Sequence, residues 1–120
     1  MRKRLGGLAI LAFMVLSTAA GAQIPLASYM GAWTTSPTGD CSRDTYVWSL
    51  DGDLITFRGP RGSVDVERVT ALRADGFTTS TVASASNRPG TRWDYQIQGP
   101  DFMQIRNLAT GRLFPATRCR

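Results

Sequence analysis

The chemistry open to this sequence is limited by the residues that it lacks. The chain has no histidine, and Lys3, close to the N-terminus, is its only lysine. General acid–base catalysis at neutral pH would therefore depend on carboxyl groups of raised pKa, and a Ser or Cys nucleophile would lack its usual base. We therefore predict that the protein is not an enzyme.

Most of the carboxylates fall where the chain is expected to turn, and there they would hydrogen-bond local backbone. These residues are Asp40, Asp44, Asp51, Asp53, Asp75 and Asp101. The sequence Asp51-Gly52-Asp53 offers two carboxylates, fewer than the roughly six to eight oxygen ligands of a calcium site. Asp65 and Glu67 share one face of a predicted strand, as paired carboxylates in a glycosidase might, but the spacing alone favours a solvated face. No metal or cofactor site is predicted.

The first 22 residues have the layout of a secretory signal peptide. A basic head, Arg2-Lys3-Arg4, precedes an apolar run from Leu5 to Leu16, and small residues follow up to Ala22. The run is shorter than the roughly 20 apolar residues that a membrane-spanning helix needs. We therefore predict cleavage after Ala22, a periplasmic or secreted location with no membrane span after cleavage, and a single domain at residues 23–120.

Two cysteines, Cys41 and Cys119, lie in the exported part of the chain. Their wide spacing and the lack of histidine do not fit a structural zinc site. An oxidising compartment favours a disulfide. We predict that Cys41 pairs with Cys119 and that the bridge holds the last strand against the first part of the fold.

The charge of the exported part is close to balanced. The whole chain has 14 basic and 9 acidic residues, but three basic ones lie in the predicted signal. The remaining arginines are scattered, with acidic residues between them. A nucleic-acid-binding protein would show a clustered basic face, so nucleic acid is not a predicted partner.

Apolar residues alternate with polar ones at a period close to two, which is typical of strands. In "TYVWSL", for example, Tyr46, Trp48 and Leu50 share one face. Sequences rich in Gly, Pro, Asp and Asn separate these runs. Eight strands are predicted, at Met30–Ser36, Thr45–Leu50, Asp53–Arg58, Ser63–Leu72, Gly76–Ser84, Thr91–Gln98, Phe102–Ala109 and Arg112–Cys119.

Eight strands joined by short reversals predict an all-β fold, an antiparallel up-and-down barrel whose closure removes exposed sheet edges. A flattened β-sandwich is the alternative. A barrel of this size is filled by side chains or holds one small ligand. The aromatic residues predicted for its core are Trp48, Phe57, Trp93 and Tyr95. The hydroxyl-rich strand from Gly76 is predicted to be a solvated outer strand, with a hydrogen-bonding pocket wall as the alternative.

The tripeptide Gly31-Ala32-Trp33 near the start and Arg118 in the last predicted strand resemble the calycin arrangement of lipocalins. In that arrangement an arginine of the closing strand covers the indole of a Gly-x-Trp. The resemblance implies that Trp33 plugs one end of the barrel and that Arg118 lies over it through a cation–π contact. The bridge from Cys41 to Cys119 would tie the same end.

The chain is also similar to small bacterial periplasmic inhibitors of secreted metalloproteases. Those proteins have the calycin barrel, an export signal, a short arm before the Gly-x-Trp and a cysteine soon after it. The resemblance implies that residues 23–30 form an arm that enters a protease cleft. The arm begins with Gln23, Ile24, Pro25 and Leu26. The chain departs from this pattern at Cys119, because the bridge in those inhibitors is local.

Three functions follow as hypotheses. The first is a non-catalytic binding module for a small ligand at the open barrel end. Its candidate ligand-binding residues are Arg92, Trp93, Tyr95 and Arg106. The second is a protein-binding module such as a metalloprotease inhibitor, which needs its arm free and extended, whereas a carrier would fold the arm over the barrel mouth. The third is a structural or envelope factor whose surface is its function.

Overall fold

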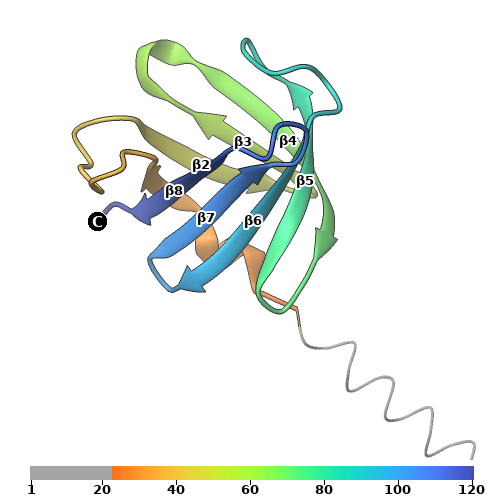
Figure 1. Ribbon diagram of the computed structural model, residues 1–120, viewed down its shortest axis with the longest axis horizontal. Helices are drawn as coiled ribbons and strands as arrows, with labels where there is room; N and C mark the ends of the chain where they lie inside the picture. Colours follow the sequence, from red (N-terminus) through yellow and green to blue (C-terminus); the bar gives the residue numbers. More distant parts are fainter. Residues whose placement is uncertain (1–22) are drawn as a thin grey trace, which may run out of the picture.

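A computed structural model describes residues 23–120, and the predicted signal peptide lies outside these residues. Eight antiparallel strands close into a barrel in chain order (Figure 1). They are β1 (Gly31–Thr34), β2 (Thr45–Asp51), β3 (Leu54–Arg58), β4 (Val64–Leu72), β5 (Gly76–Ala83), β6 (Arg92–Gly99), β7 (Phe102–Asn107) and β8 (Leu113–Arg118). Two short 3₁₀ helices are η1 (Leu26–Tyr29) and η2 (Pro60–Gly62). The predicted up-and-down barrel is confirmed, and the flattened sandwich is not formed.

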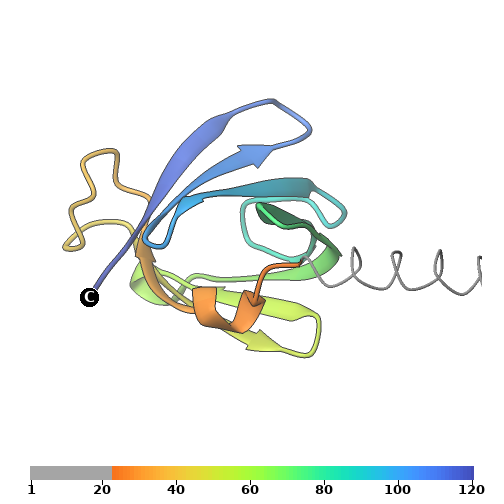
Figure 2. The same ribbon diagram turned by 90° about the horizontal axis from the view of Figure 1, so that it is seen from below.

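The two ends of the barrel differ. The turns after β2, β4 and β6 share one end with residues 23–30, which we call the N-terminal segment (orange, at the lower end of the barrel in Figure 1 and beneath it in Figure 2). The connections after β1, β3, β5 and β7 belong to the opposite end. We call the first the sealed end, because the N-terminal segment lies over it, and the second the open end, because that segment lies at the other end of the barrel.

The barrel interior is filled mainly by aromatic and aliphatic side chains. Trp48, Phe57, Trp93 and Tyr95 are all buried, as predicted. Several rings lie against one another, with centroid separations of 5.1 Å for Trp33 and Trp48 and 4.5 Å for Phe77 and Tyr95. Such pairs contribute about 0.5 to 1.5 kcal/mol each beyond the area that they bury.

The seam between β1 and β8 is the shortest ladder of the barrel. Only Trp33 and Thr34 of β1 pair with β8, opposite Arg118 and Thr117. The Arg118 guanidinium carbon lies 4.5 Å from the centroid of the Trp33 ring. Gly31 has φ of 124°, a conformation that side-chain-bearing residues rarely adopt, which explains the glycine before Trp33.

Arg118 also connects three segments of the chain at this seam. Its guanidinium donates to the carbonyl oxygens of Ser28 and Met30 in the N-terminal segment and of Pro100 in the turn after β6. It forms an ion pair with Asp101 at 3.2 Å. One side chain thus holds the N-terminal segment, the turn after β6 and Trp33 together.

The predicted disulfide between Cys41 and Cys119 is confirmed, and it joins residues 78 positions apart. Cys41 lies in the connection after β1, and Cys119 directly follows β8. The backbone N–H of Cys119 donates to the Ala32 carbonyl in β1. The bridge therefore reinforces the seam where the strand pairing is shortest.

Opening the disulfide should cost far more stability than removing the Arg118 side chain. The chain-entropy model assigns about 4 to 5 kcal/mol to a loop of this length, whereas Arg118→Ala should cost about 2 kcal/mol through its lost stacking and hydrogen bonds. Denaturant unfolding followed by tryptophan fluorescence measures both. A reduced form as stable as the oxidised one would contradict this account of closure.

Candidate functional site

One carboxyl group lies inside the barrel. Glu67 on β4 is only 7% exposed and sits opposite Ile55 of β3, which is also buried. Its Oε1 accepts hydrogen bonds from the hydroxyls of Thr79 and Tyr95, each at 2.5 Å. The prediction of a solvated face is therefore wrong for Glu67, because the register with β3 turns that face inward.

The surroundings of Glu67 favour its neutral form. Burial raises the pKa of Glu67 to about 7; the hydrogen bonds from Thr79 and Tyr95 oppose this rise, and the nearby charge of Asp65 adds to it. Burial and the charge of Glu67 raise the pKa of Tyr95 well above its usual value. Glu67 therefore exchanges its proton near neutral pH, while Tyr95 keeps its own.

The second oxygen of Glu67 is open to a further partner. Oε2 accepts no hydrogen bond from the described residues. Every fully buried side-chain nitrogen or oxygen in residues 23–120 has a hydrogen-bond partner, so Oε2 must reach solvent. A ligand at this edge of the interior can therefore reach this oxygen in place of solvent.

β5 supplies a polar wall beside Glu67. Thr79 and Thr81 point inward and are buried, and Thr81 accepts a hydrogen bond from the Trp93 indole N–H at 2.9 Å. The prediction of a solvated outer strand is therefore wrong for these two residues, and the alternative of a hydrogen-bonding wall describes them. The alternation was hidden in the sequence because Thr78 and Ser80, on the other face, are also hydroxyl residues.

The four residues predicted to bind a ligand do not come together. Trp93 and Tyr95 lie inside the barrel, whereas Arg92 and Arg106 are exposed on its outer face. The polar part of the interior comes instead from Glu67, Thr79 and Thr81. Sequence reasoning noted Glu67 only as half of a carboxylate pair.

Among residues 23–120, the charge of Glu67 has no cationic partner. None of the arginines in residues 23–120 is buried, and their ion pairs are with aspartates. A second carboxylate, Asp65, is half-buried on the same face of β4, opposite the buried Phe57. The inner face of β4 is therefore acidic toward the open end.

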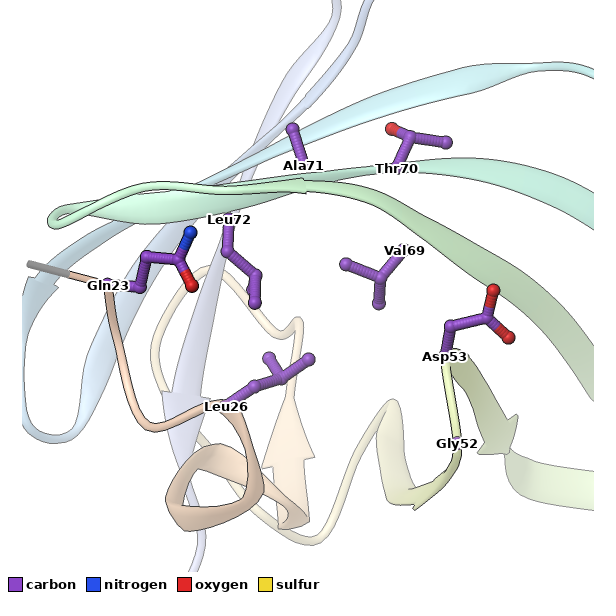
Figure 3. A pocket seen from close by; sticks show the side chains of 8 residues that line it. All are labelled: Gln23, Leu26, Gly52, Asp53, Val69, Thr70, Ala71 and Leu72. Carbon is purple, nitrogen blue, oxygen red and sulfur yellow. The ribbon is translucent and has the colours of Figure 1, made fainter. Parts of the chain in front are cut away.

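A cleft of about 300 Å³ lies at the sealed end, between the N-terminal segment and β4 (Figure 3). The side chains of Leu26, Leu72 and Val69 point toward one space, with Gln23 and Asp53 at its sides (Figure 3). Its centre is apolar, so the cleft offers little for polar recognition.

The N-terminal segment packs against the barrel. Ile24 is buried in the core, and its N–H donates to the Arg73 carbonyl. The Trp33 indole N–H donates to the Tyr29 carbonyl at the end of η1. These contacts hold the segment over the sealed end. It is therefore not the free, extended arm expected of an inhibitor, and it does not cover the barrel mouth as expected of a carrier.

Within residues 23–120, no three His, Cys, Asp or Glu side chains form a group that could hold a metal ion. No helix of this part is long and apolar enough to cross a membrane. The chain matches no protein family model, no curated protein and no solved structure. The barrel is compatible with a calycin-like fold, and the case for that class rests on its geometry alone.

The buried carboxyl should make stability depend on pH. Because the folded state raises the pKa of Glu67 from 4.5 to about 7, its contribution is fully present below about pH 4.5 and is lost as pH rises to about 7. The difference is about 3 kcal/mol. Glu67→Gln should flatten the unfolding free energy over this interval. Parallel pH profiles for the two proteins would contradict a buried, titrating Glu67.

The packing of the N-terminal segment can be tested with two neighbouring substitutions. Ile24→Ala should destabilise the protein by about 2 kcal/mol or more, because it empties a buried site. Pro25→Ala, at an exposed position, is the matched control and should have little effect. Equal, negligible effects in thermal unfolding would mean that the segment is free.

Proposed function

We propose that this protein is a non-catalytic, calycin-like binding module that takes a small ligand at the open end of its barrel, beside Glu67. The observation that carries the proposal is the buried carboxyl of Glu67, set near aromatic rings, with one oxygen that accepts no hydrogen bond from the described residues. A buried carboxyl destabilises a fold relative to a well-packed apolar side chain. A strongly perturbed carboxyl in such a place is typical of functional sites.

The two ends of the barrel support entry from the open end. The N-terminal segment and Arg118 cover the sealed end, which leaves the connections after β1, β3, β5 and β7 to frame the other. Asp65 and Thr81 are nearer that end than Glu67 and Thr79, their neighbours on the same strands. The disulfide supports a secreted or periplasmic location for the module.

Binding is favoured over catalysis because of what surrounds Glu67. A general acid with a pKa near 7 would be suited to proton transfer, but Oε1 is already held by two protein hydroxyls. No arginine is buried among the described residues, and the chain has no histidine. The described residues therefore place no cationic side chain at Glu67 that could stabilise a negatively charged transition state.

Metalloprotease inhibition is the weaker alternative. An inhibitor of that type would have to release the N-terminal segment from the contacts made by Ile24, Tyr29 and Arg118. These contacts oppose a free arm.

The proposal predicts that protein extracted mildly from the periplasm carries a small molecule, which native mass spectrometry would detect as added mass. Glu67→Gln should abolish the added mass. Asp53→Asn is the matched control, because it removes a carboxylate beside the sealed-end cleft, and it should keep the ligand. A wild-type chain that always appears at its bare mass would overturn the proposal, as would a ligand lost from Asp53→Asn but kept by Glu67→Gln.

A further inference from the structure

We propose that Glu67 recognises an organic cation, namely the primary ammonium group of a ligand whose apolar part lies against the aromatic rings of the open half. This inference rests on the proposed function and adds the chemical class of the ligand. Three observations carry it: the missing counter-charge, the unused carboxylate oxygen and the aromatic surroundings.

The missing counter-charge sets the sign of the ligand. The ionised carboxylate of Glu67 is expensive to bury without a cation beside it. Asp65 on the same strand face adds negative charge, and the cations nearest in the chain, such as Arg68, are exposed on the outside. A cationic ligand would supply the partner that the fold does not, and an anion would be repelled.

The hydrogen-bonding groups select an ammonium rather than a quaternary cation. Oε2 of Glu67 accepts no hydrogen bond from the described residues. An ammonium group offers three N–H donors that could bind it. The bonds to Oε1 hold the carboxylate in one orientation, so Oε2 is positioned before the ligand arrives. Charge-assisted bonds of this kind are roughly twice as strong as neutral ones.

The neighbouring rings suit both parts of such a ligand. The Tyr95 ring, whose hydroxyl binds Glu67, stacks on Phe57 with centroids 6.2 Å apart, and Trp93 binds Thr81, which lies opposite Glu67. Aromatic faces attract cations by about 0.5 to 2 kcal/mol and also pack against apolar groups. An amine with a small aromatic or aliphatic body fits these surroundings.

Binding of a cation is coupled to loss of a proton. The titratable groups around Glu67 are Asp65 on its own strand and Tyr95 on β6, and Tyr95 stays protonated. β3 and β5 face it with Ile55 and Phe57 and with Thr79 and Thr81, none of which is an acid or base in this range. Since only ionised Glu67 pairs with an ammonium, affinity should fall about tenfold for each pH unit below about 7 and level off above it.

The effect of ligand charge on affinity can be measured with three probes that carry the same ring but a positive, a neutral or a negative group. These probes are benzylammonium, benzyl alcohol and benzoate. Each is titrated into the disulfide-bonded protein at pH 8, where Glu67 is ionised, while NMR follows the Trp93 indole N–H and the backbone amide of Thr81. We expect benzylammonium to bind at least about tenfold more tightly than benzyl alcohol, and benzoate not to bind. Repeating the benzylammonium titration at pH 6 should give about tenfold weaker binding.

Two variants complete the test. Glu67→Gln should bring benzylammonium to the affinity of benzyl alcohol and remove the pH dependence, whereas Asp51→Asn, which removes an exposed carboxylate, should change neither. If benzyl alcohol binds the interior as tightly as benzylammonium, cation recognition is overturned and the proposed function stands. If no probe shifts the Trp93 or Thr81 signals, the inference is overturned, while native mass spectrometry of the extracted protein decides the proposed function separately. If Glu67→Gln binds benzylammonium as tightly as the wild type does, the cation binds elsewhere and the inference is rejected.

Discussion

Closure of the seam between β1 and β8, by the Cys41–Cys119 disulfide and by the contact of Arg118 with Trp33, is the constraint on which this barrel most depends. The seam has only two residue pairs, so hydrogen bonds between β1 and β8 cannot by themselves keep the sheet closed. Arg118 compensates because its guanidinium covers the indole while its N–H groups reach carbonyls of the N-terminal segment and of the turn after β6. The disulfide adds a covalent tie beside it. Without this closure, β1 and β8 would become exposed sheet edges.

The stability gained at the sealed end allows the barrel to keep a destabilising buried carboxyl, Glu67, in its other half. Stacked rings and aliphatic side chains fill the sealed half, and closure at the seam holds the strands in one register. Glu67 can then be placed inside with its carboxyl held by Thr79 and Tyr95, although an apolar residue there would be more stable. The stability of one half of the barrel thus supports a polar group in the other.

The fold was largely predictable from the sequence, and the site was not. Period-two alternation and turn residues placed every strand boundary within two residues of the structure, since both signals are local. The inward direction of Glu67 is not local, because it depends on pairing with Ile55 of β3. The packing of the N-terminal segment against the barrel was equally unpredictable from the sequence. Ile24 is a single apolar residue, and its burial depends on the space left between the turn after β4 and η1.

Two register shifts between β4 and β5 explain the position of the polar wall formed by Thr79 and Thr81. The register between β4 and β5 shifts twice, between Val66 and Glu67 and between Val69 and Ala71. The stretch from Glu67 to Val69 lies between these shifts and pairs with Thr81 to Thr79. Bulges re-aim side chains and are common next to functional sites. Here they set Thr81 opposite Glu67 and bring Thr79 to its carboxyl. The register shifts that interrupt the β4–β5 ladder therefore bring the hydrogen-bonding partners of Glu67 together. A regular hairpin with this sequence would pair Glu67 with a different residue of β5.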